Sequence, residues 1–101
     1  MTCGYLIYQY RVTDRARVDE IGPLVTPILR RHGGRIAIAS HVKPLEGRPP
    51  THIVVYRFES TDAAQAFHDS PEHRELDGLR HAVTEGFALA VPGFSDRSEN
   101  E

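Results

Sequence analysis

The stretch Tyr5–Val12, with the sequence YLIYQYRV, is rich in aromatic and β-branched residues and predicts a β-strand. Successive side chains of a strand point to opposite faces of its sheet. One face here carries Leu6, Tyr8, Tyr10 and Val12, and the other carries Tyr5, Ile7, Gln9 and Arg11. Apolar residues therefore occupy both faces, a pattern typical of a strand that is covered on both sides.

A helix is expected after this strand. Apolar residues recur at helical spacing at Val18, Ile21, Leu24, Val25, Ile28 and Leu29. Gly22-Pro23 and Pro27 interrupt the pattern, and each proline removes an amide donor and clashes with the preceding turn, so we expect a kinked or two-piece helix. Gly33-Gly34 then ends it.

The rest of the chain also reads as a series of strands and helices. Strands are predicted over residues 35–45, 52–58 and 86–91, and the first two of these form a hairpin across the turn at 46–51. A short helix begins near Ser60–Asp62, and Ser70-Pro71-Glu72 starts another that carries Leu76, Leu79 and Val83 on one stripe. The order strand, helix, strand, strand, helix, strand predicts an α+β fold of the ferredoxin-like βαββαβ type with a four-stranded antiparallel sheet. We expect one domain over residues 1–94 and a loose polar tail over 95–101.

The two-faced strands also predict a homodimer. The helices of a βαββαβ unit cover only one face of its sheet, and the other would form an unusually large apolar patch if it stayed in water. A second copy of the same sheet, related by a two-fold axis, is the simplest cover.

Composition excludes several classes of function. The net charge of -2 leaves no basic footprint for nucleic acid, and no apolar run reaches the roughly 20 residues of a membrane-spanning helix. No secretory signal opens the chain, and its single cysteine, Cys3, cannot form an internal disulfide, so we expect a cytoplasmic protein.

An ordered series of short motifs is similar to a known family. In chain order the motifs are Gly4-Tyr5, Val12-Thr13-Asp14, His32-Gly33-Gly34-Arg35, Leu45-Glu46-Gly47, Phe58 with Ser60, Ser70-Pro71-Glu72, Leu79-Arg80 and Val91-Pro92-Gly93. Over residues 4–93 the chain resembles the bacterial domain of unknown function family 1330, within the dimeric α/β-barrel superfamily. The chain departs from the family's pattern at Arg57, usually acidic, and at His52, where Arg is common.

That resemblance implies a ferredoxin-like protomer whose sheet packs on its partner's sheet as a dimeric α/β barrel. It also implies a small-molecule pocket between the sheet and the helices. Members of the superfamily include cofactor-free monooxygenases, polyketide cyclases, muconolactone isomerases and haem-binding enzymes.

Polar residues on the strands are candidates for that pocket. His52 and Tyr56 share a face of one predicted strand, and Gln9 and Arg11 share a face of its neighbour, so these groups are expected to converge, either in a pocket or at the dimer interface. His41 shares a face with small residues, which leave room for a ligand or a helix.

Two residues of the last helix complete the candidate site. On a helical wheel Glu72 falls on the apolar stripe, where it is either a base in a pocket or a partner of the helix dipole. Arg80 flanks the stripe and either pairs with Glu72 or binds an anionic group of the substrate.

A third group of the same helix is assigned to solvent. His73, Asp77 and His81 stand at i, i+4 and i+8, but the wheel turns this row away from the apolar stripe, so we predict an exposed face and no metal site.

These observations favour a small-molecule-binding protein that acts without a cofactor on a small organic acid or aromatic metabolite, as an isomerase, cyclase or monooxygenase. His52 and Glu72 are the expected catalytic residues, and Arg80, Tyr56, Gln9, Arg11 and His41 the expected substrate-binding residues. A binding protein without catalysis, and a haem-handling protein, remain the alternatives.

Overall fold

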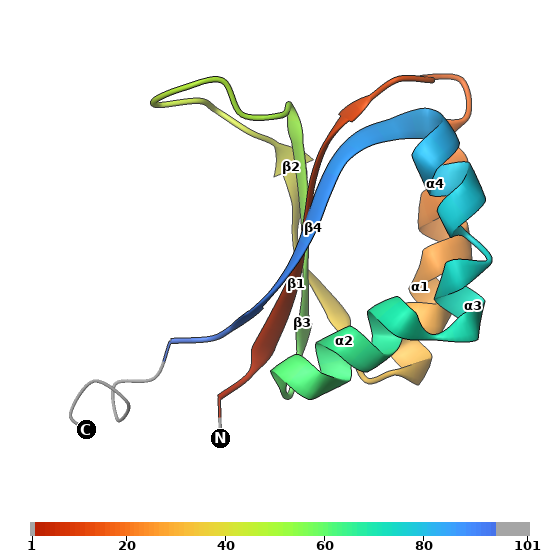
Figure 1. Cartoon of the computed structure of the whole chain (residues 1–101), viewed down its shortest axis with the longest axis vertical. Helices are drawn as coiled ribbons and strands as arrows, with labels where there is room; N and C mark the ends of the chain where they lie inside the picture. The colour runs from red at the N-terminus through yellow and green to blue at the C-terminus, as the bar shows by residue number, and fades with distance from the viewer. Residues whose placement is uncertain (1, 95–101) are drawn as a thin grey trace.

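The computed structural model describes residues 2–94, and the tail expected over 95–101 lies outside the described residues. The strands are β1 (Gly4–Val12), β2 (Arg35–His41), β3 (His52–Phe58) and β4 (Thr84–Pro92). The helices are the 3-10 helix η1 (Val18–Glu20) and the α-helices α1 (Ile21–Arg31), α2 (Thr61–Asp69), α3 (Pro71–Arg74) and α4 (Asp77–Val83). The sheet has the order β2-β3-β1-β4 with antiparallel neighbours, and the helices lie against one of its faces (Figure 1). The α+β, ferredoxin-like prediction is confirmed.

The first helical segment has two pieces, as its prolines predict. η1 leads directly into α1, and Pro27 lies inside α1. The segment ends at the two glycines: Gly33 adopts a φ of 75°, and the Gly34 amide donates to the carbonyl of Leu29 at 2.9 Å. The left-handed turn satisfies an otherwise free carbonyl of the last helical turn and directs the chain into β2.

The second helical segment breaks where the sequence predicted one continuous helix. Ser60 and Ser70 cap α2 and α3 as expected, each accepting a hydrogen bond from the amide three residues ahead. At Leu76 the amide donates to His73, three residues back instead of four, and α4 begins after it. This tightened turn changes the phase of the helix, so a single helical wheel does not describe both pieces.

A bulge in β2 changes which of its residues face the helices. Ile36 pairs with Tyr56 and Ile38 pairs with Val55, so Ala37 is an extra residue between them. Because a bulge shifts the alternation by one, Ile36 and Ile38 point to opposite faces. His41 therefore lies on the helix-facing side with Ile36 and with Ala39, one of the small residues expected on its face.

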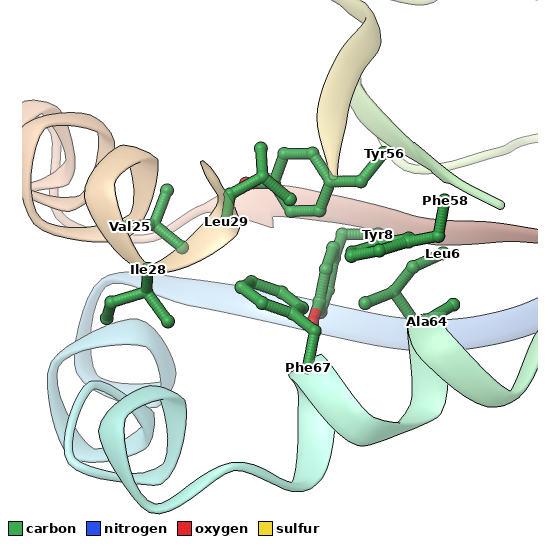
Figure 2. Close-up of a cluster of buried hydrophobic side chains, with 9 residues drawn as sticks. All are labelled: Leu6, Tyr8, Val25, Ile28, Leu29, Tyr56, Phe58, Ala64 and Phe67. Atoms are coloured by element: carbon green, nitrogen blue, oxygen red, sulfur yellow. The ribbon is translucent and has the colours of Figure 1, made fainter. Parts of the chain in front are cut away.

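The core fills the space between the helices and one face of the sheet. Leu6 and Tyr8 of β1 and Phe58 of β3 meet Leu29 of α1 and Phe67 of α2, and these side chains are buried (Figure 2). This face of β1 is the one that the sequence assigns to Leu6 and Tyr8. The core holds α1 and α2 at fixed positions over the sheet.

The other face of the sheet carries an apolar row, and none of the helices described within residues 2–94 covers it. The register aligns Ile38, Val55, Ile7 and Leu89 across all four strands. Ile38 is 47% exposed and Leu89 is 46% exposed. The helices leave this face open (Figure 1).

Candidate functional site

A cavity of about 240 Å³ lies between the helix-facing side of the sheet and the helices α1 and α4. Its apolar wall includes Val18, Ile21, Val25, Ile36, Val54 and Leu76. Its polar groups include Tyr8, Tyr10, Tyr56, His73, Arg80 and His81. An apolar cavity with a few convergent polar groups is the usual form of a small-molecule site.

The Tyr8 hydroxyl lies within hydrogen-bond reach of two histidines. Its oxygen is 2.9 Å from Nδ1 of His68 and 3.4 Å from Nε2 of His73. Nδ1 of His73 is 3.1 Å from the backbone carbonyl of His68. A carbonyl only accepts, so this nitrogen carries the hydrogen, and the neutral His73 ring presents Nε2 as an acceptor.

Burial keeps Tyr8, Tyr56 and His73 of the cavity wall uncharged near neutral pH. Burial raises the pKa of Tyr8 well above its ordinary value, although the Arg80 guanidinium opposes this shift. Burial also raises the pKa of Tyr56 to about 12 and lowers the pKa of His73. These tyrosines are therefore hydrogen-bond donors in the cavity, and His73 is a neutral acceptor.

Arg80 supplies the positive charge of the cavity. Its Nη2 donates to Asp77 at 3.1 Å, and its Cζ lies 5.2 Å from the centroid of the Tyr8 ring. Its Nε is buried and has no hydrogen-bond partner. A buried donor without a partner is costly, so this atom is where a bound acceptor would be stabilised.

Tyr56 and Arg80 are the two sequence-expected residues that line the cavity. His52 and His41 lie beyond one end of it: the His52 ring stacks on Tyr10, with centroids 5.3 Å apart, and its centroid is 4.3 Å from that of His41. Burial, with the nearby His41 and Arg15, lowers the pKa of His52. Neither histidine lines the cavity, but Tyr10, on which His52 stacks, forms part of its wall.

Gln9 and Arg11 do not converge with His52 and Tyr56. The register pairs Gln9 with Ile53, so it lies on the open face of the sheet, whereas His52 lies opposite Tyr10 on the helix-facing side. Arg11 forms an exposed ion pair with Glu85 at 2.8 Å. The expected convergence is wrong because residues paired across neighbouring strands share a face, and Gln9 pairs with Ile53, the neighbour of His52, whose side chain points to the other face.

Glu72 does not face the sheet, and the expected pair with Arg80 is wrong. Its carboxylate is exposed and forms an ion pair with Arg31 at the end of α1, with His32 Nε2 3.9 Å away. Arg80 pairs with Asp77 instead. The contacts of Glu72 connect α3 to α1 and leave it outside the cavity wall.

His73 is buried, 2% exposed, and the predicted solvent-facing row is wrong at this position. The wheel treated residues 71–83 as one helix, but the tightened turn at Leu76 separates His73 from His81, which is exposed. The sequence pattern assigns neither Tyr8 nor His68 a role in the site: Tyr8 is expected only as one of the apolar-face residues of the first strand. The sequence did contain a signal for this. Ser70-Pro71 starts a new helix, so His73 lies in its first turn, and the apolar stripe of Leu76, Leu79 and Val83 does not determine which way that turn faces.

The part of the chain that the structure describes holds no group of three or more His, Cys, Asp or Glu side chains arranged to bind a metal ion. Among residues 2–94, no helix has the length and apolar character needed to cross a membrane.

The sequence matches a known family model along most of its length. The model is that of a domain of unknown function, DUF1330, and it covers residues 3–94. The chain belongs to the DUF1330 family. No functionally curated protein matches it.

Solved structures share the fold of this DUF1330 protein at low sequence identity. A protein of unknown function from Rhodopseudomonas palustris has a TM-score of 0.70 and 14% identity, over 93% of this chain and 84% of its own. The cofactor-independent oxygenase SnoaB from Streptomyces nogalater has a TM-score of 0.70 and 8% identity, over 94% and 96%. A dimeric ferredoxin-like protein of unknown function from Thermobifida fusca has a TM-score of 0.52 and 17% identity, over 91% and 92%. At these identities the likeness shows the ferredoxin-like fold.

Proposed function

We propose that the protein is a homodimer that binds a small organic acid or aromatic metabolite in the cavity and acts on it as a cofactor-free isomerase, cyclase or monooxygenase. The site for the ligand is the space between the sheet and the helices, and the partner covers the open face of the sheet. The protein is expected to work in the cytoplasm.

The open face of the sheet supports the dimer. Ile38 and Leu89 each leave nearly half of their side chains in water, and Val55 and Ile7 join them into one row across the sheet. Since a two-fold axis presents the same row on both protomers, sheet-to-sheet packing removes both from water. The Thermobifida fusca neighbour is described as dimeric.

The single observation that carries the ligand proposal is the buried, unpartnered Nε of Arg80 in the cavity wall. The Asp77 carboxylate holds Nη2, whereas Nε is a buried donor of the same guanidinium without a partner, and we assign the ligand to it. A carboxylate or phenolate oxygen accepts a charge-assisted hydrogen bond there, and the aromatic and aliphatic wall accommodates an apolar body.

Acid–base chemistry in this proposal belongs to the cavity wall. Tyr8 and His73 line the cavity as a neutral donor and a neutral acceptor, whereas His52 and Glu72 lie outside it. We therefore assign proton transfer to Tyr8, with His73 as the acceptor that positions its hydroxyl. SnoaB, which shares the fold, is described as a cofactor-independent oxygenase, and this supports chemistry carried by side chains alone.

The proposal is tested by calorimetric titration with benzoate and with benzamide, which has the same shape without the charge. We expect benzoate to bind more tightly than benzamide, and Arg80→Gln to abolish that preference while leaving benzamide binding nearly unchanged. Arg74→Gln is the matched control, because it removes an equal charge from an exposed position of α3. Equal binding of the two ligands to the wild type, or full preference in Arg80→Gln, would overturn the assignment of Arg80.

Native mass spectrometry of freshly purified protein tests the assembly and catalysis. A dimer that carries additional mass would identify the natural ligand. Incubation with that ligand then separates the two remaining readings, since an enzyme converts it and a binding protein returns it unchanged. A monomer would overturn the dimer.

A further inference from the structure

We propose that Tyr8, His73 and His68 form a proton relay that connects the ligand cavity with solvent in a second hollow, between α2 and β4. Tyr8 and His73 are the inner end of this relay, and His68 is its outer end. The proposal deepens the proposed function and rests on it for the presence of a ligand, but the connection itself is a property of the free protein.

The three side chains form a compact triangle. Ring centroids lie 6.0 Å apart for Tyr8 and His68, 6.2 Å for Tyr8 and His73, and 5.3 Å for the two histidines. Each ring is connected to the others by hydrogen-bond contacts between 2.9 and 3.4 Å, one of them through the His68 backbone. Figure 2 shows the Tyr8 hydroxyl directed away from the sheet toward Phe67 of α2.

The two ends of the triangle reach different spaces. Tyr8 and His73 line the ligand cavity, and both are almost completely buried. His68 is only partly buried and lines a second hollow, between α2 and β4. That hollow is lined by Leu6, Gln65, His68, Asp69, Ala88, Leu89 and Ala90, and shares no residue with the first. Of the three side chains, His68 is therefore the one that water reaches through the second hollow.

The hydrogen bonds allow two arrangements that differ by a proton shift. In one, the Tyr8 hydroxyl donates to Nδ1 of His68, whose own hydrogen is on Nε2. In the other, Nδ1 of His68 carries the hydrogen and donates to Tyr8, which donates to Nε2 of His73. The Tyr8 hydroxyl has one hydrogen and cannot donate it to both histidines at once. It donates to His68 in the first arrangement and to His73 in the second.

Passage from the first arrangement to the second moves one proton from the cavity to water. The ligand gives its proton to the Tyr8 oxygen as the Tyr8 hydrogen moves to Nδ1 of His68, and His68 releases its Nε2 hydrogen to water. Tyr8 and His68 stay neutral, the ligand keeps the electron pair of the broken bond, and water gains the proton. The reverse passage delivers a proton to the ligand. His73 positions the hydroxyl by accepting its hydrogen in the second arrangement.

A purely structural network would have a different signature. Buried polar groups are normally paired, so the same contacts could serve only to satisfy one another. Loss of a member would then loosen the packing and let water reach the buried hydrogens faster. Loss of His68 from a relay instead slows exchange of the Tyr8 hydroxyl hydrogen, because the route to solvent is removed. The sign of the change separates the two roles.

The experiment measures, by NMR, the exchange with water of the Tyr8 hydroxyl hydrogen in the ligand-free protein, with the His73 Nδ1 hydrogen as an internal reference that the relay does not move. We expect His68→Gln to slow exchange of the Tyr8 hydrogen several-fold and to leave that of the His73 hydrogen unchanged, because the amide can accept the Tyr8 hydrogen bond but cannot pass a proton on. Gln65→Ala is the control: it opens the same hollow beside His68 and should not slow the Tyr8 hydrogen.

A second variant protects the test against a folding defect in the first. In His68→Ala the exchange of the Tyr8 hydrogen should be slow and should recover when free imidazole is added, because imidazole can enter the hollow and replace the missing ring. Exchange of the Tyr8 hydrogen that is unchanged or faster in both variants would overturn the relay, whatever the benzoate titration shows. Loss of the benzoate preference alone would overturn the proposed ligand and leave the relay intact.

Discussion

The guanidinium of Arg80 lies over the ring of Tyr8, with Cζ 5.2 Å from the ring centroid. Asp77 holds the same guanidinium from the side at 3.1 Å. A cation over an aromatic face and an ion pair together restrict the side chain before any ligand arrives. The cavity therefore presents a positioned Nε, and binding need not order a flexible arginine.

Arg80→Lys should weaken benzoate binding although it keeps the charge. Lysine has no Nε–H in that direction and cannot form the planar contact with Tyr8 while it pairs with Asp77. We also expect a loss of about 1 kcal/mol in the free energy of unfolding from the missing cation–π contact. Calorimetric titration and urea denaturation measure the two effects, and Arg74→Lys at an exposed position is the control. Wild-type benzoate affinity in Arg80→Lys would show that charge alone suffices.

Stability should fall in mild acid because of His73. Burial lowers the pKa of this histidine in the folded state below the ordinary value of 6.5. At a pH between the folded and the unfolded pKa of His73, the unfolded chain binds more protons than the folded protein. The contribution of neutral His73 to the free energy of unfolding is therefore complete above about pH 6.5 and is lost as the pH falls toward the folded pKa. His52, whose pKa burial and His41 also lower, acts in the same direction.

His73→Gln isolates this effect, because the amide can donate to the His68 carbonyl and accept from Tyr8 without titrating. We expect the loss of unfolding free energy between about pH 7 and pH 5 to be smaller in this variant than in the wild type. Denaturation at several pH values gives the slope, and His81→Gln at an exposed position should leave it unchanged. Parallel slopes for the wild type and His73→Gln would contradict the assignment.

The fold could be predicted because its signals are local. The alternation along β1, the serine caps at Ser60 and Ser70, and the glycine pair after α1 each act within a few residues, and the structure contains all of them. The order of elements then leaves few topologies. The sequence did not predict which way side chains face after a local irregularity in the backbone. The two irregularities are the bulge at Ala37 and the tightened turn at Leu76.

The candidate site was recovered only in part for the same reason. Tyr56 and Arg80 lie on regular elements whose direction the pattern specifies, and both line the cavity. His73 lies before the tightened turn, so the wheel assigned it to solvent. The same wheel predicted that Glu72 faces the sheet, but its partner is Arg31, forty-one residues earlier in the chain. The spacing of apolar residues within one helix cannot predict an ion pair between residues so far apart in sequence.

Leu89→Glu should convert the protein to a monomer. Leu89 ends the apolar row on the open face, and a carboxylate there would lose its water when two sheets pack. Leu24→Glu is the matched control, because Leu24 and Leu89 are both 46% exposed but Leu24 lies on α1. Sedimentation and native mass spectrometry should show a dimer for the wild type and Leu24→Glu. Dimeric Leu89→Glu, or a monomeric control, would require another interface.

Two glycines should respond to alanine in opposite directions. A Cβ at Gly34 would lie 2.5 Å from both Leu29 Cδ1 and Phe58 Cε2, in the core where α1 turns into β2, whereas a Cβ at Gly78 would meet nothing within 4 Å. We expect Gly34→Ala to lose about 2 kcal/mol of unfolding free energy through overpacking. Gly78→Ala, inside α4, should gain about 0.5 kcal/mol, because alanine restricts the unfolded chain and favours helix.

Urea denaturation at one fixed protein concentration measures both changes, since dimerisation makes apparent stability depend on concentration. Equal slopes against urea would show that the variants unfold from the same compact state. The comparison of Gly34→Ala with Gly78→Ala also tests how firmly α1 packs on the core. If Gly34→Ala were neutral, α1 could move away from Phe58, and the cavity wall that Ile21 and Val25 form on that helix would not be fixed. A loss at Gly34 with a gain at Gly78 instead means that the core holds α1 rigidly over the cavity.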